Sequence, residues 1–184
     1  MNMKKITMAL GLIGLLCLFA STKAEAANPD TMNITVTVAT ALSVDITGDP
    51  YEFGTIAASA STGSTRAITV TNDTGGRTED FTINAANSTN WTLGASPGAE
   101  TFALFAMLNS VQPLDADFHA TNDDLTAAPQ DMDATLFTGD QTGDDVVDTG
   151  SRSLWFKLQT PTSTAFQTEQ TIVVTVTAAD ASTF

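Results

Sequence analysis

The sequence predicts an all-β protein, an antiparallel β-sandwich of about eight or nine strands interrupted by one acidic loop. Apolar residues alternate with Thr, Ser, Asn and Asp in many short segments, which is the period-two pattern of strands with one buried face. Gly, Pro, Asn and Asp separate these segments and mark turns. No stretch keeps the rhythm of about 3.6 residues that an amphipathic helix requires. These observations favour two packed antiparallel sheets.

The first 26 residues have the layout of a secretory signal peptide. Two lysines precede an apolar stretch, residues 8–20, and Ala24-Glu25-Ala26 places small residues where a signal peptidase cuts. The apolar stretch is shorter than the roughly 20 residues of a membrane span. We therefore expect cleavage after Ala26 and secretion of residues 27–184 as a single domain, extracellular or at the cell surface, with no membrane span left.

The chain after residue 26 is strongly acidic, with four basic and 20 acidic residues and a formal net charge of −16. Such a charge repels nucleic acids and anionic lipid surfaces, so neither is an expected partner. This part of the chain also contains no cysteine, because Cys17 belongs to the apolar stretch. Packing and hydrogen bonds must therefore hold the fold together without disulfide bonds.

The alternating segments define the expected strands in order along the chain. The first is the strongest: from Met32 to Ile46 the apolar residues stand mainly at even positions, and a bend near residues 39–41 divides this length in two. The segment from Thr101 to Leu108 is apolar on both faces, as in a strand covered on both sides or a short buried helical turn. Further strands are expected near residues 51–54, 65–72, 81–85, 91–93, 154–158 and 172–176.

Residues 113–150 form the acidic loop, which we interpret as a surface excursion of the single domain. It holds ten aspartates, half of the acids that remain after residue 26. Calcium prefers hard oxygen ligands, which closely spaced aspartates supply. The candidate calcium ligands are Asp140, Asp144, Asp145 and Asp148. The alternative is a solvated acidic loop without a metal, since the spacing does not match an EF-hand loop.

Several short motifs follow one another in a set order. An alternating strand leads into Phe53-Gly54-Thr55-Ile56, a later strand ends in Trp91-Thr92-Leu93, and Leu154-Trp155-Phe156-Lys157-Leu158 precedes the closing strand. This order is similar to that of the WxL-type surface domains of bacteria, although the second Trp-x-Leu motif is absent here. The resemblance implies a monomeric module that binds cell-wall polymers or glycans. Its binding candidates are Trp91, Leu93 and Trp155, and burial of these side chains in the core is the alternative.

The apolar positions at the start of the mature chain are Met32, Ile34, Val36 and Val38. This alternation resembles the N-terminal strand of immunoglobulin-like subunits of fimbriae and other filaments. The resemblance implies an immunoglobulin-like sandwich whose N-terminal strand completes the sheet of a neighbouring copy. Such strand addition gains affinity from main-chain hydrogen bonds and specificity from alternate side chains. The alternative is that residues 32–46 form the first strands of their own sandwich.

No catalytic motif is visible, so we expect a protein that is not an enzyme. His119 is the single histidine, and neither a nucleophile elbow, a His-Glu-x-x-His helix nor a phosphate-binding glycine loop occurs. The leading hypothesis is a secreted structural or adhesive protein of the cell surface that assembles into a filament. The alternatives are the monomeric wall- or glycan-binding module and, last, a secreted hydrolase with paired carboxylates. The expected partners are copies of the chain itself or a surface polymer.

Overall fold

The computed structural model describes residues 35–36, 41–137 and 139–181 of the chain. The chain divides into two units, residues 1–38 and residues 39–184. In the first unit only Thr35 and Val36 are described, and both side chains are exposed. The predicted signal peptide and the other predicted assembly residues lie outside the described residues; these are Met32, Ile34 and Val38. All secondary structure that follows belongs to the second unit.

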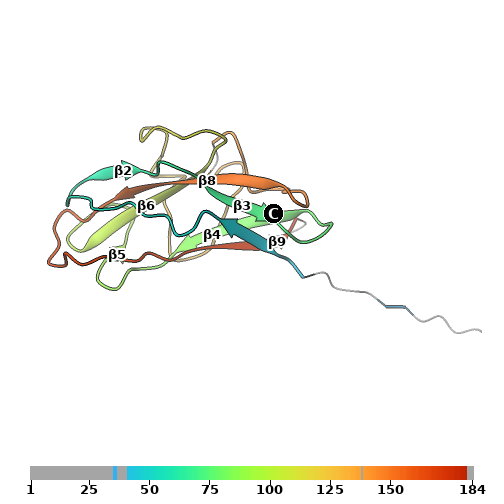
Figure 1. Cartoon of the computed structure of the whole chain (residues 1–184), viewed down its shortest axis with the longest axis horizontal. Coiled ribbons are helices and arrows are strands. Elements are labelled where there is room, and N and C mark those ends of the chain that lie inside the picture. Colours follow the sequence, from blue (N-terminus) through green and yellow to red (C-terminus); the bar gives the residue numbers. More distant parts are fainter. Residues whose placement is uncertain (1–34, 37–40, 138, 182–184) are drawn as a thin grey trace, which may run out of the picture. The chain divides into compact units, whose positions relative to one another are not determined.

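The described part of the second unit contains nine strands and no helix (Figure 1). The strands are β1 (Val44–Thr47), β2 (Ser61–Gly63), β3 (Ile68–Asn72), β4 (Glu79–Ala85), β5 (Thr92–Leu93), β6 (Thr101–Leu108), β7 (Gln130–Asp131), β8 (Ser151–Gln159) and β9 (Val174–Asp180). The predicted all-β sandwich is therefore confirmed.

The strands form two sheets. The first has six strands in the order β1–β3–β8–β6–β5, and β2 pairs with the C-terminal end of β8. The second has three strands in the order β7–β4–β9. All these pairs are antiparallel except β5 with β6. Apart from β5 and β6, neighbouring strands are not consecutive along the chain, so the sheets depend on non-local pairing.

The main hydrophobic core is built from alternate residues of both sheets. Val70 of β3 and Phe81 and Ile83 of β4 are completely buried in it. Leu104 of β6 and Phe156 of β8 belong to the same cluster. Burying each of the larger apolar side chains contributes roughly 1.5–3 kcal/mol. The alternation that predicted the sandwich is thus the alternation that fills its centre.

The central strands β6 and β8 are buried on both faces. Their opposite face carries a second cluster that contains Phe105, Met107 and Trp155, and Phe118 of the following loop packs onto it. This arrangement explains why residues 102–108 are apolar throughout. Of the two predicted structures for this segment, the strand covered on both sides is the correct one.

Residues 113–150 are largely irregular, and among the described residues β7 is their one strand. Apolar side chains spaced along the segment nevertheless reach the interior: Phe118, Leu125, Met132, Phe137 and Val146. The segment therefore contributes to the core and also forms an acidic surface. The interpretation as a surface excursion did not include the contribution to the core. Single apolar residues between aspartates have no periodic pattern, so their burial could not be inferred from the sequence.

The short strand expected at residues 51–54 is wrong, because the backbone there belongs to neither sheet. The rings of Tyr51 and Phe53 instead pack edge to face, with centroids 4.8 Å apart. The Tyr51 hydroxyl also accepts a hydrogen bond of 2.7 Å from the main-chain nitrogen of Thr65. The apolar alternation at this position reflects an aromatic pair rather than a strand.

Candidate functional site

Strand β9 forms one edge of the three-stranded sheet. It pairs with β4 along its full length, residues 174–180 against residues 79–85. Among the described residues, no strand pairs with the other side of β9. The main-chain nitrogen of Ala86 donates to the carbonyl of Val173 at 2.9 Å, so alternate residues from Val173 onward face β4. The peptide groups of residues 174, 176 and 178 therefore point to the open side.

Apolar side chains border this open side. Val176 is buried, and Val174 and Ala178 are half-buried against the main core, whereas Thr175 and Thr177 are exposed. The edge strand of the other sheet, β1, contacts β9, and its apolar side chains are also half-buried against the core. A further strand beside β9 would cover apolar surface that both edge strands leave partly accessible to water.

Strand β9 lacks the features that protect most natural edge strands. It contains neither Lys nor Pro, and it pairs with β4 without a bulge. Its one charged residue, Asp180, stands at the very end and forms an ion pair with Arg77. An open edge of this length without protecting residues is a template for pairing with another strand.

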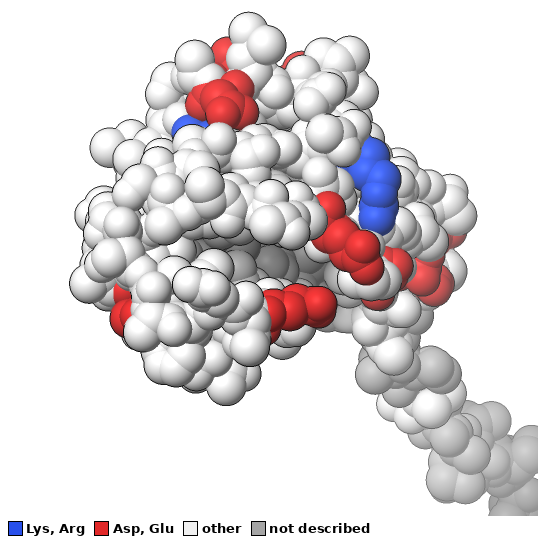
Figure 2. Space-filling model, turned by 60° about the vertical axis from the view of Figure 1, so that its left-hand side comes forward, with Lys and Arg blue, Asp and Glu red and all other residues white. Residues whose placement is uncertain are grey.

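Acidic residues outnumber basic ones in the domain, and two of the few basic side chains have specific partners. Arg66 donates to the carbonyls of Gly48 and Pro50, and Arg77 pairs with Asp180. Figure 2 shows one face of the molecule, which is hollowed and carries more acidic than basic side chains.

Three carboxylates from distant parts of the chain meet at the start of β4. Asp80 lies on β4, while Asp144 and Asp145 lie on the loop before β8, and one carboxylate oxygen of each lies within 4.8 Å of the others. Asp80 is fully buried, Asp144 half-buried and Asp145 exposed. The main-chain nitrogen of Asp145 donates to Oδ1 of Asp80 at 2.8 Å, whereas the buried Oδ2 has no hydrogen-bond partner.

The environment of Asp80 disfavours its charged form. Burial raises the pKa of Asp80, the hydrogen bond from Asp145 opposes this rise, and the negative charges of Asp144 and Asp145 add to it. The cluster can therefore hold its full charge at neutral pH only at an energetic cost. A proton or a cation bound among the three carboxylates would reduce that cost.

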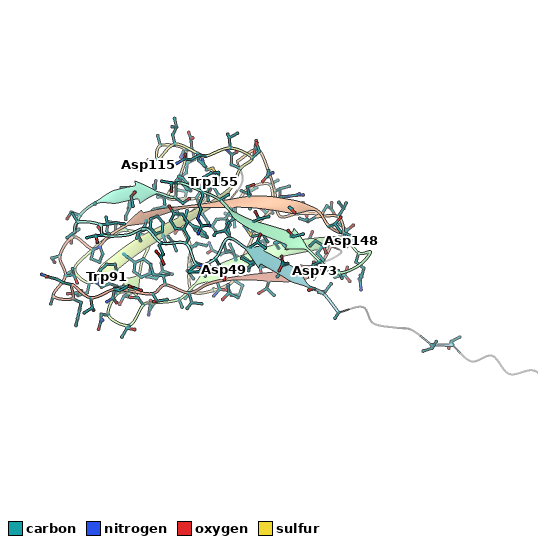
Figure 3. All side chains as sticks on the ribbon, viewed as in Figure 1. Asp49, Asp73, Trp91, Asp115, Asp148 and Trp155 are labelled. Atoms are coloured by element: carbon teal, nitrogen blue, oxygen red, sulfur yellow. The ribbon has the colours of Figure 1, made fainter. Side chains whose placement is uncertain are left out.

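The structure brings together two of the four predicted calcium ligands, Asp144 and Asp145, but not Asp140 or Asp148. Hydrogen bonds from the hydroxyl and the main-chain nitrogen of Ser110 engage Asp140 and lower the pKa of its carboxyl. Asp148 accepts a hydrogen bond of 3.0 Å from the main-chain nitrogen of Gly75 (Figure 3).

The member of the cluster that the sequence did not indicate is Asp80, which precedes Asp145 by 65 positions. Only the packing of the loop against β4 brings these residues together. Their spacing in the sequence therefore gives no sign of the contact. The available signal was the pair Glu79-Asp80 at the start of a strand that otherwise alternates apolar and polar residues. Two adjacent acids that are both fully buried are unusual, since buried acids normally have partners.

The predicted glycan-binding residues pack into the interior. Trp155 is 8% exposed, and its indole nitrogen donates to the carbonyl of Asn109 at 2.8 Å. Trp91 and Leu93 are half-buried against the main core, and the indole nitrogen of Trp91 donates to the Thr164 hydroxyl at 3.0 Å. The two tryptophans lie apart (Figure 3) and pack against different apolar clusters. They do not form one aromatic surface on which a sugar could stack.

The single histidine lines a pocket of about 530 Å³ between β6 and the acidic loop. Its lining residues are Met107, Asn109, Asp117, His119, Asn122, Asp123, Ala134, Thr135 and Gly139. Asp117 accepts a hydrogen bond from the nitrogen of Leu114 at 2.7 Å, and Asp123 accepts one from the nitrogen of His119 at 2.6 Å. These contacts give both acids of the pocket a structural role in the turns of the loop.

Comparisons with known proteins found no protein-family model and no curated protein sequence that matches this chain. Within the described ranges, no helix has the length and apolar character needed to cross a membrane.

Proposed function

We propose that the protein is a secreted, non-catalytic structural protein of the cell surface whose copies join head to tail by strand addition. In this arrangement residues 32–38 of one copy pair with the open edge of β9 in the next. The observation that carries the proposal is this edge, which is unpaired among the described residues and contains neither Lys nor Pro.

The two partners match in length and in side-chain pattern. Strand β9 has seven residues, and so does the segment 32–38, which corresponds to about 23 Å of extended chain. The apolar residues at even positions of the segment would face the core beside the half-buried Val174 and Ala178. The polar residues between them would face solvent, as Thr175 and Thr177 do in β9.

The geometry of the N-terminal end of the domain supports addition to a neighbouring copy. The main-chain nitrogen of Ser43 donates to the carboxylate of Glu79 at 3.0 Å, and Glu79 pairs with Asp180 at the C-terminal end of β9. A segment that precedes Ser43 can therefore run along its own β9 only by reversing direction. A neighbour's segment needs no such reversal. Because the donating segment and the accepting edge are different surfaces, repeated addition gives an open filament.

Single-site variants test each half of this contact. Ala178→Pro removes a peptide N–H on the open side of β9 and leaves the hydrogen bonds to β4 intact, as is typical of Pro in edge strands. Val36→Asp places a charge on the apolar side of the segment, and Thr35→Asp is its matched control one position away. We expect residues 27–184 and the Thr35→Asp control to form multimers, and the other two variants to remain monomeric in light scattering and negative-stain microscopy.

Mixing the two inactive variants separates addition between copies from addition within one copy. Ala178→Pro keeps an intact segment, and Val36→Asp keeps an intact edge, so an equimolar mixture should form dimers but no filaments. Monomers of residues 27–184 at every concentration tested, or monomers alone in the mixture, would contradict the proposal. Unchanged unfolding temperatures of the variants would show that the edge rather than the fold was altered.

A further inference from the structure

The carboxylates of Asp80, Asp144 and Asp145 carry a charge that the described residues do not neutralise. The ion pair found among these residues joins Arg77 to Asp180 and lies outside the cluster. Arg152 reaches the same loop, but it donates to the carbonyl of Thr142 rather than to a carboxylate. Three like charges with oxygens within 4.8 Å repel one another, and burial strengthens this repulsion.

Asp80 is a fixed part of the interior rather than a surface acid. Its side chain is 0% exposed, and its Oδ2 atom is buried without a hydrogen-bond partner. The hydrogen bond from Asp145 to Oδ1 orients the carboxylate toward the loop. Proteins normally keep a buried carboxylate only with hydrogen-bond partners, a countercharge or a coordinated metal.

We propose that Asp80, Asp144 and Asp145 bind a calcium ion. Carboxylate oxygens are the ligands that calcium prefers, and the cluster contains neither His nor Cys, which transition metals favour. Three oxygens that lie at most 4.8 Å apart all lie within about 2.8 Å of a common centre, close to the roughly 2.3–2.6 Å of calcium–oxygen contacts, so a small approach of the side chains lets one ion contact all three. Magnesium requires shorter distances and a stricter octahedral geometry. Water molecules would supply the remaining ligands.

The ion would fasten the loop before β8 to the start of β4. Main-chain hydrogen bonds already join these segments: the nitrogen of Phe81 donates to the carbonyl of Gly143 at 2.9 Å, and Glu79 and Val146 exchange hydrogen bonds of 2.9 and 2.8 Å. The carboxylates work against this attachment, and calcium would turn their repulsion into attraction. Calcium binding would stabilise a single copy and does not depend on strand addition.

The test measures the unfolding temperature of residues 27–184 in EDTA, in calcium chloride and in magnesium chloride at equal ionic strength, with calorimetric titration of calcium alone. Extracellular calcium sites often have a Kd of about 0.1–1 mM. At about 100 times Kd we expect the unfolding temperature to rise by about 5–10 °C, with a smaller rise in magnesium. Asp80→Asn should unfold at a higher temperature than the wild type in EDTA and should not respond to calcium.

Asp140→Asn is the matched control, because Asp140 lies on the same loop but outside the cluster. It should keep the full response to calcium. If Asp80→Asn does not fold, Asp144→Asn replaces it, since Asp144 is only half-buried. Calcium binding that persists in both cluster variants would overturn the proposal. So would an absence of binding together with stabilisation of the wild type at low pH, which would indicate a proton shared by the carboxylates instead.

Discussion

At the scale of single residues, the buried lysine of this acidic protein is held by main-chain oxygens and aromatic rings. The Lys157 ammonium lies 4.6 Å from the ring centre of Phe105 and 5.3 Å from that of Phe118. It donates to the carbonyls of Asp115 at 3.0 Å and Phe118 at 3.2 Å. Burial lowers the pKa of Lys157, and the charges of Asp115 and Asp123 partly offset this effect. The contacts fasten the acidic loop to the outer face of β8.

Two aspartates of the acidic loop should contribute to the stability of the protein with opposite dependences on pH. Burial raises the pKa of Asp123, so the folded protein holds this proton more tightly, and the stability contribution falls as pH rises through the raised pKa. Hydrogen bonds, first from the Thr135 hydroxyl, lower the pKa of Asp133, and the stability that they provide is lost as pH falls. As pH rises from about 2.5 to 7, we expect Asp133→Asn to lose stability relative to the wild type mainly below about pH 4.5, and Asp123→Asn to gain stability relative to the wild type above about pH 4.

Urea unfolding of both variants and the wild type across this pH range measures the differences directly. The slope of the unfolding free energy against pH is informative even where the amide substitution changes a hydrogen bond. Such a change alters the free energy of unfolding by the same amount at every pH. If the unfolding free energy of both variants changed with pH in the same way as that of the wild type, the pKa values of the two carboxyls would not be shifted and the prediction would be wrong.

At the scale of elements, the sequence was most informative where a strand has a regular pattern. The alternation near residues 65–72 and 81–85 predicted β3 and β4. Residues 101–108, apolar on both faces, indicated either the doubly buried strand that β6 forms or a short buried helical turn. The acidic loop was not predictable in the same way. Phe137 is buried at a residue with a positive φ of 58°, a local conformation that no periodic pattern signals.

The contribution of this loop to the core can be measured with two alanine variants. Phe137 is 0% exposed, so Phe137→Ala should cost about 3–5 kcal/mol and lower the unfolding temperature by about 6–20 °C. Leu114 belongs to the same loop but is 72% exposed, and Leu114→Ala should change stability by less than about 0.5 kcal/mol. Similar small effects for both variants in calorimetry would mean that the loop covers the core without stabilising it.

At the scale of the whole molecule, the sequence predicted the sandwich but neither its open edge strand nor its carboxylate cluster. The order of strands is set by pairings between distant segments, such as β4 with β9, and alternation within a strand carries no information about its neighbour. The open edge of β9 therefore emerges only from the assembled sheet. Asp80 was not among the predicted calcium ligands for the same reason: its proximity to Asp144 and Asp145 depends on the fold.

The net charge of −16 on residues 27–184 opposes any association of copies, so assembly should depend on salt. Like-charged surfaces repel over about 30 Å at 10 mM salt but over only about 8 Å at 150 mM. We expect the assembled fraction, measured by light scattering, to rise as sodium chloride increases over this range. Ala178→Pro should remain monomeric at both concentrations, because screening removes repulsion but cannot replace the main-chain hydrogen bond lost at β9. Assembly of this variant at high salt would instead indicate non-specific association that does not use the edge strand.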